Sequence, residues 1–496
     1  MSSINSESQQ DAGTWWSRAC GGREVLVVAM PLVVSSLSWT VMTFIDRMFL
    51  FQVSGAAMAA AFFAGTSWFV VFCFHLGICS YANTFVSQYF GDGQPLRIGA
   101  SVWQSFWFAL TSFLLAAAVY PFAPWLFGLA GHSEEILTQE IEYFQILCFG
   151  GPGMVVATAL SCFYSGRGKT RVVMYVDTTV VAVNLLLDYL WIFGYAGFPA
   201  LGIAGAGWAT VVSLWLKVAI YFLLMLKRQN RQQFNTLSGY RFDRELFGRL
   251  AYYGGPCGAQ MLLDVMGFTI FILLIGKLGT LEAEATTMAF SVSTLAFMPV
   301  FGFGMAASIL VGQRLGENRE DLATRATWTS LHIGVGYIAI LSVFYVLTPD
   351  VFLMGFFEGD KKVSPELRTM AANLLCFVAA YNLFDAMLIV FSSALKGAGD
   401  TRFILRVSLV MASLLALISW LTIDVLKLGI YESWIAVTVW IWCLGIIFFR
   451  RFIQGQWRKM RVIEQQRVGT TAEEHSDFSL EGAAMEEVPI VMGNEL

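Results

Sequence analysis

The sequence predicts an all-α polytopic membrane protein, with about twelve transmembrane helices in two pseudo-symmetric six-helix lobes. Three observations predict this fold class: the composition, the spacing of the apolar runs and an internal duplication. Hydrophobic residues make up 57% of the 496 residues and charged residues only 13%, whereas soluble domains carry about 25% charged residues. A soluble protein of this size would need a charged surface, and the long apolar runs of this chain cannot provide one.

The apolar runs follow one another along the chain and are separated by short polar loops. A helix needs about 20 predominantly apolar residues to cross a bilayer. In order, the predicted spans are 24–50, 55–84, 98–122, 137–164, 172–194, 202–226, 247–276, 283–312, 325–348, 367–394, 403–424 and 430–450. They divide the chain into a cytoplasmic N-terminal segment (1–23), an N-lobe (24–226), a cytoplasmic linker (227–246), a C-lobe (247–450) and a cytoplasmic tail (451–496). The tail is polar and acidic and is predicted to be disordered.

The distribution of basic residues orients the predicted helices, because cytoplasmic loops of membrane proteins carry an excess of Lys and Arg. With the N-terminus inside, most basic residues fall in the predicted inner loops. The predicted outer loops hold only Lys277, Lys361, Lys362, Arg368 and Lys427. This alternation supports twelve spans with both termini in the cytoplasm. Arg47 and Lys217 remain within spans, each close enough to a helix end to extend its charge toward water.

The two halves of the chain repeat a sequence pattern. Val86-Ser-Gln-Tyr-Phe-Gly91 matches Val311-Gly-Gln-Arg-Leu-Gly316 at an offset of 225 residues, and the same offset pairs Pro31 with Pro256. Ser165-Gly-Arg-Gly-Lys-Thr-Arg171 similarly matches Lys396-Gly-Ala-Gly-Asp-Thr-Arg402. An even number of spans separates matched positions, so the halves are expected to be related by an axis along the membrane normal. Such a bundle, with a cleft that opens alternately to either side, fits a secondary transporter and also a lipid flippase.

Four acidic residues lie deep within predicted spans, where an ionised carboxylate costs about 2.5–3.5 kcal/mol on insertion scales. They are Asp46 and Asp188 in the N-lobe and Asp264 and Asp385 in the C-lobe. Spacings of four residues place Asn184 beside Asp188, Gln260 beside Asp264 and Tyr381 beside Asp385 on shared helix faces. Carboxylate and amide oxygens suit Na⁺ or an exchangeable proton. The alternative is that the acids only hold helices together, which is less compatible with two acids in each lobe.

At these positions the chain resembles the multidrug and toxic compound extrusion (MATE) transporters, across essentially all of its predicted spans. The resemblance rests on Pro31 followed by Ile45-Asp46, on the two matched Gln-containing turns, and on Ala394-Leu-Lys-Gly-Ala-Gly-Asp-Thr-Arg402. The resemblance implies that Asp46, Asn184, Asp188 and Thr210 match an N-lobe cation site of the DinF-type branch. It also implies that Asp264, Tyr381 and Asp385 match the C-lobe residues of the NorM-type branch.

Two departures from the family pattern bear on the coupling ion. Asp264 stands where NorM-type members carry Glu, which shortens the reach of the carboxyl group. Arg47 follows Asp46 where a small polar residue is usual, and it could neutralise that acid. The sequence therefore combines features of both branches and leaves Na⁺ and H⁺ open. Na⁺ would bind at Asp46, Asn184 and Asp188, or at Asp264 and Asp385.

The resulting hypothesis is a secondary antiporter that exports amphipathic or cationic organic compounds in exchange for Na⁺ or H⁺. The alternative is a lipid-linked glycan flippase of the same wider superfamily, which would be expected to line its cleft with cations. We expect no enzymatic activity and no cofactor, because no nucleophile–base pair, metal motif or cofactor fingerprint appears in the sequence. The expected partners are small organic substrates and the lipid bilayer, not nucleic acid. We expect a monomer in the inner (plasma) membrane.

Overall fold

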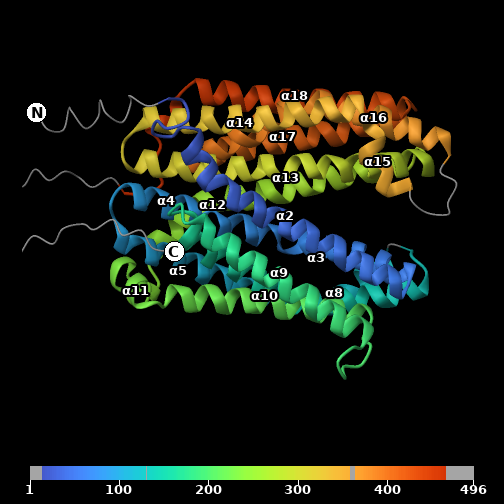
Figure 1. The fold of residues 1–496 in the computed structure, drawn as a ribbon, viewed down its shortest axis with the longest axis horizontal. Helices are drawn as coiled ribbons and strands as arrows, with labels where there is room; N and C mark the ends of the chain where they lie inside the picture. The colour runs from blue at the N-terminus through green and yellow to red at the C-terminus, as the bar shows by residue number, and fades with distance from the viewer. Residues whose placement is uncertain (1–13, 130, 358–363, 465–496) are drawn as a thin grey trace, which may run out of the picture. The chain divides into compact units, whose positions relative to one another are not determined.

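The computed structural model describes residues 14–129, 131–357 and 364–464, and these residues form helices without a β-strand. They include twelve helical segments that are long and apolar enough to cross a membrane, which confirms the predicted number of spans (Figure 1). The observed helices extend several residues beyond most predicted bounds, because polar residues at the helix ends continue the helical turns.

The first six spans are α2 (Gly22–Val53), α3 with α4 (Gly55–Ser80 and Ala82–Gly91), α5, α6 and α7 (Pro95–Ala109, Thr111–Val119 and Ala123–Gly128), α8 (Glu134–Ser165), α9 (Thr170–Phe193) and α10 (Ile203–Met225). The short helix α11 (Arg228–Phe234) follows in the linker. The last six are α12 (Arg244–Ile275), α13 (Thr280–Gly316), α14 (Glu320–Leu347), α16 (Pro365–Ala398), α17 (Thr401–Trp420) and α18 (Ile430–Ile453), with α15 (Pro349–Phe357) between α14 and α16.

The helices pack as two bundles, and the first helix of each bundle also contacts the other bundle. In the N-lobe, α8 packs against α3 and α10, and α9 packs against α10; in the C-lobe, α16 packs against α13, α14 and α18. Helix α2 packs on α9 of its own lobe and on α13 of the C-lobe. Its counterpart α12 packs on α17 of its own lobe and on α3 of the N-lobe. The reciprocal pattern agrees with the duplication in the sequence.

The lobes meet most closely at the ends of α4 and α13, and the repeated sequence motif forms this contact. Gln88 Nε2 donates to the carbonyl of Gly397 at 2.9 Å, and Gln313 Nε2 donates to the carbonyl of Gly166 at 2.9 Å. A side chain on Gly91 would meet the carbonyl of Gln313. We call these contacts, together with the matching one at Gly316, the inner seal, because they lie at the membrane face predicted to be cytoplasmic.

The start of the C-terminal tail is folded, which corrects the prediction that 451–496 is disordered. A 3₁₀ turn (Gln456–Lys459) follows α18, and the side chains of Trp457 and Val462 are 0% exposed. The backbone N–H of Val462 donates to Gln88 Oε1 at 2.8 Å, and its carbonyl accepts from Arg249. Trp457 packs on Phe452 of α18, and Val462 reaches Gln88 of the inner seal, so this part of the tail is ordered despite the polar composition of the whole tail. Residues 465–496 lie outside the described residues.

The linker between the lobes is fastened to the N-lobe. The indole of Trp103 on α5 donates to the carbonyl of Thr236 at 2.7 Å, and Gln104 Nε2 donates to that of Arg241 at 3.0 Å. Arg167, just beyond α8, stacks on Phe234 with its guanidinium carbon 4.2 Å from the ring centre. Burial lowers the pKa of Arg167 to about 10. The linker therefore moves with the N-lobe as long as these contacts are kept.

Candidate functional site

The N-lobe acids form one buried cluster. Asp46 comes from α2, and Asn184 and Asp188 come from one face of α9, as their spacing predicts; their residues are 8%, 0% and 0% exposed. Because α2 packs on α9, the carboxyl groups of Asp46 and Asp188 lie close enough for their charges to interact. Two neighbouring buried carboxyl groups favour binding one proton, because like charges disfavour ionisation of both. The cluster can therefore hold a proton between two helices.

Several polar atoms in this cluster have no hydrogen-bond partner among the described residues. They are Oδ1 of Asp46, both carboxyl oxygens of Asp188 and both side-chain polar atoms of Asn184. A buried polar group without a partner costs about 1–3 kcal/mol. Oxygen atoms of this type are the ligands of hard cations such as Na⁺. The donor set therefore fits a cation or an exchangeable proton.

Tyr143 on α8 extends the cluster, and the sequence analysis did not identify it. Its hydroxyl group lies near Asp46 and Asp188 and shares a hydrogen bond with the hydroxyl of Thr210 on α10. Thr210 is thereby connected to the acids through Tyr143. On its own helix, Gln139 and Glu140 lie one turn before Tyr143, so helical spacing gave no link from Tyr143 to the acids of α2 and α9. Its position follows from the packing of α8 against α10.

Arg47 lies beside the cluster but is directed away from its centre. Its guanidinium carbon is 5.0 Å from the centre of the Phe62 ring, and its charge acts on Asp46 and Tyr143. No hydrogen bond or ion pair between Arg47 and Asp46 occurs among the described residues. The positive charge therefore offsets part of the negative charge of the cluster without occupying the carboxyl oxygens of Asp46.

In the C-lobe, the predicted residues form two separate groups. Gln260 Nε2 donates to Asp264 Oδ2 at 3.1 Å on α12, and Asp264 is exposed. The hydroxyl groups of Tyr381 on α16 and Ser293 on α13 are 3.1 Å apart, and half-buried Asp385 follows Tyr381 by one turn. No interaction joins Asp264 to Asp385 within the described residues. The Na⁺ site predicted from these two acids is not assembled in this conformation.

Lys396 lies two residues beyond the predicted end of the tenth span, which places it in a predicted inner loop. It belongs to the last turn of α16, and its charge acts on Asp264. Lys217, by contrast, pairs with Asp177 at 2.8 Å, so its charge is neutralised inside the N-lobe. The loop assignment of Lys396 was wrong because α16 continues to Ala398, four residues beyond the predicted end at 394.

The fold and the cluster define a polytopic membrane protein with two homologous lobes and a buried acidic site in the first. The MatE family model matches residues 31–190 and 256–421, and the chain belongs to this family. The two matches begin at Pro31 and Pro256, the positions that the repeat pairs.

Curated relatives and solved structures agree with this assignment. The multidrug resistance protein MdtK of Yersinia pestis (strain Pestoides F) is 28% identical over 397 residues, which are 80% of this chain and 86% of the relative. MdtK of Yersinia enterocolitica is 27% identical over the same shares. The fold is similar to that of the eukaryotic MATE transporter AtDTX14 (TM-score 0.78, 19% identity, 88% of this chain and 96% of that one). It is also similar to a MATE family transporter of the MOP superfamily in an outward-facing conformation (TM-score 0.79, 15% identity, 89% and 97%).

Proposed function

We propose that this protein is a secondary antiporter that exports amphipathic, often cationic organic compounds in exchange for Na⁺ or H⁺. The observation that carries the proposal is the buried cluster of Asp46, Asn184 and Asp188, with its unpartnered polar atoms, in a two-lobed MatE bundle. Relatives named multidrug resistance proteins support the substrate class. Both termini are assigned to the cytoplasm and the chain to the inner membrane, where it acts as a monomer because one chain holds both lobes.

The proposed mechanism is thermodynamic linkage between the ion and the lobes. Asp46 lies on α2, which contacts both α9 of the N-lobe and α13 of the C-lobe. An ion or proton that binds between Asp46 and Asp188 changes the packing of α2 on α9 and thereby biases the inner seal. Differential affinity for the two conformations is the physical requirement for such coupling. With cytoplasmic termini, the inner seal makes this conformation outward-facing.

The geometry does not favour the flippase alternative. A flippase would present free cations to lipid phosphates in its cleft. Lys217 is paired with Asp177 at 2.8 Å, and the charge of Lys396 acts on Asp264. These two cations are thus engaged by acidic side chains, and Arg47 instead lies over the ring of Phe62, with its guanidinium carbon 5.0 Å from the ring centre. We assign no catalytic role to any residue of the clusters.

The test is transport by purified protein in sealed vesicles with imposed ion gradients. We expect ethidium transport driven by a Na⁺ or H⁺ gradient in the wild type. The single variants Asp46→Asn and Asp188→Asn should lose about 5- to 150-fold of the gradient-driven rate, the range of typical coupling free energies. Asp350→Asn is the matched control, because Asp350 pairs with Arg368 at the surface. Wild-type coupled transport in both cluster variants would refute the proposal.

A further inference from the structure

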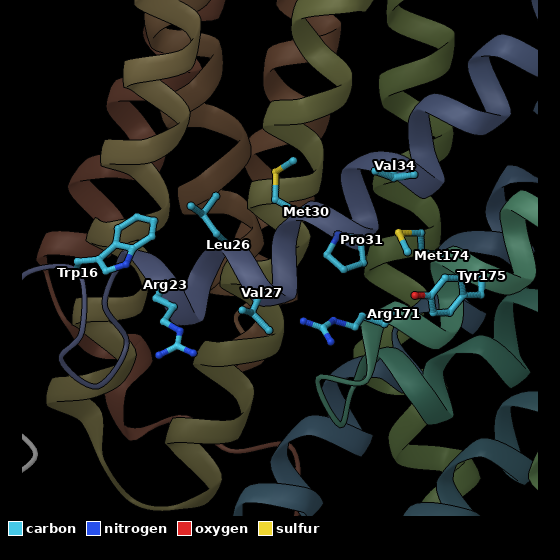
Figure 2. Close-up of a pocket in the computed structure, with 10 residues that line it drawn as sticks. All are labelled: Trp16, Arg23, Leu26, Val27, Met30, Pro31, Val34, Arg171, Met174 and Tyr175. Carbon is cyan, nitrogen blue, oxygen red and sulfur yellow. The ribbon is translucent and has the colours of Figure 1, made fainter. Parts of the chain in front are cut away.

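A groove of about 390 Å³ opens on the surface between the first halves of α2 and α9, away from the acidic cluster (Figure 2). Arg23 is the second residue of α2 and Arg171 is the second residue of α9. Both helices begin at the same predicted membrane face, so the two guanidinium groups lie at one boundary of the bilayer. Figure 2 shows them on either side of Val27, with the Arg171 side chain extending toward α2.

The two positive charges have no side-chain partner among the described residues. Both Arg23 and Arg171 are exposed. Glu24, next to Arg23, instead pairs with Arg314 at 2.5 Å, and Asp177, two turns from Arg171, pairs with Lys217 at 2.8 Å. The nearby carboxylates therefore pair with other basic residues and not with Arg23 or Arg171. The mouth of the groove is positively charged.

The walls of the groove become apolar with distance from the arginines. On α2, Val27, Met30 and Val34 follow Arg23 along one helix face and are 46%, 46% and 38% exposed. On α9, Met174 lines the opposite wall. A free inorganic anion would gain nothing from these apolar walls. A phospholipid matches both parts, because its phosphate group is anionic and its acyl chain is apolar.

The residues at the mouth fit the interfacial level of a membrane. Trp16 and Tyr175 line the groove and are 49% and 65% exposed. Amphipathic aromatic rings are enriched at the height of lipid headgroups. Basic pockets between membrane helices on the cytoplasmic side are suited to anionic headgroups.

We propose that this groove binds an anionic phospholipid of the cytoplasmic leaflet, with its phosphate between Arg23 and Arg171 and an acyl chain along Met30 and Val34. The lipid bridges α2 and α9 at the end of α2 that contacts the C-lobe. The start of α2 is fastened to the C-lobe, because Arg314 pairs with Glu24 and Thr329 Oγ1 donates to the carbonyl of Cys20 at 2.9 Å. Helix α9 belongs to the N-lobe, so the bound lipid stabilises the inner seal.

Lipid retention by the full-length protein tests the site. Purified protein is mixed with phosphatidylglycerol or phosphatidylcholine, and bound lipid is counted by native mass spectrometry. We expect the double variant Arg23→Gln/Arg171→Gln to retain about 30-fold less phosphatidylglycerol, since it removes two basic residues and each contributes about 1 kcal/mol near anionic lipid. The matched control is Arg228→Gln/Arg231→Gln, which removes two exposed charges from α11 on the same face. Thermal melting in phosphatidylcholine checks that both variants are folded.

Two results would contradict the proposed lipid site. Equal losses in the two double variants would show non-specific charge attraction. Displacement of phosphatidylglycerol by millimolar inorganic phosphate or by water-soluble glycerophosphoglycerol would show an anion site without a role for the acyl chain. The effect of the lipid on the contact between α2 and the C-lobe can be measured separately, because Cys20 is 0% exposed at this contact. Phosphatidylglycerol should slow alkylation of Cys20 several-fold in the wild type and not in Arg23→Gln/Arg171→Gln; an unchanged rate in the wild type would overturn that effect.

Discussion

Gln88 and Gln313 occupy matched positions of the sequence repeat, and each donates its side-chain amide to a glycine carbonyl of the opposite lobe at 2.9 Å. The accepting glycines, Gly397 and Gly166, are themselves matched positions of the second repeated motif. The duplication therefore encodes a pseudo-symmetric contact between the lobes. Alternating access requires these two hydrogen bonds to break and reform together.

Removal of either glutamine amide should weaken the inner seal. Each amide donates to a buried backbone carbonyl, so Gln88→Ala and Gln313→Ala should each shift the equilibrium toward inner opening by about 0.5–1.5 kcal/mol. Distances between spin labels on α4 and α13 would measure the population of the open state. Gln88→Ala should have the larger effect, since Gln88 also accepts from Val462 of the tail at 2.8 Å. Unchanged distance distributions in both variants would contradict the role of the seal.

Gly91 and Gly316 allow the close approach of the lobes at the same place. A side chain at Gly91 would collide with the carbonyl of Gln313, and one at Gly316 with the carbonyl of Gln88. Gly91→Val and Gly316→Val should therefore prevent inner closure and abolish substrate export in vesicles. Gly248→Val is the control, because nothing lies within 4 Å of a side chain added at Gly248. Normal export by the two seal variants would show that the lobes need not close this tightly.

The hydroxyl of Tyr143 should support ion binding. It lies near Asp46 and Asp188 and bonds to Thr210, so Tyr143→Phe removes one hydrogen bond and keeps the packing of the ring. We expect the apparent affinity for the coupling ion to fall about 2- to 12-fold, the equivalent of one hydrogen bond. Tyr345→Phe removes a buried hydroxyl that donates to Val292 in the C-lobe at 3.0 Å, and it should leave this affinity unchanged. Equal losses in the two variants would point to general destabilisation.

Asp264 and Lys396 should act on cationic substrates with opposite sign. Asp264 is exposed and the positive charge of Lys396 acts on it. We expect Asp264→Asn to weaken ethidium binding about tenfold and Lys396→Met to strengthen it, because opposite charges attract across a partly desolvated site. Fluorescence titration of the single variants and of the double variant gives the coupling between the two residues. Additive effects would show that the two side chains act independently.

Cys20 should react slowly with maleimides while the inner seal is closed. Burial, followed by the charge of Glu24, raises the pKa of its thiol to about 11. Because the thiolate is the reactive form, only about one thiol in a thousand is ionised at pH 8. The alkylation rate should rise about tenfold per pH unit between pH 7 and 10, as measured by mass spectrometry of the peptide that contains Cys20. A rate that does not change with pH would mean that opening of the structure, and not ionisation, limits the reaction.

Local sequence signals predicted the elements and most of the candidate residues. Apolar runs gave the twelve spans, and a spacing of four residues placed Asn184 and Asp188 on one face of α9, since helical periodicity depends only on neighbouring residues. The predictions that failed were those that depended on contacts between residues distant in sequence. The composition of the tail predicted disorder, although Trp457 and Val462 are 0% exposed. The end predicted for the tenth span at residue 394 placed Lys396 in a loop, although it lies in the last turn of α16.

The number of spans, their duplication and the position of each acid along its span could be predicted from the chain alone, because hydropathy and repeat offsets do not depend on packing. Which acids meet depends on how the helices pack. Asp46 and Asp188 lie next to each other because α2 packs on α9, and Tyr143 joins them because α8 packs on α10. Asp264 and Asp385 lie on α12 and α16 and do not interact within the described residues. Helix periodicity fixes the face of a side chain, but only the packing of helices distant in sequence fixes what that face contacts.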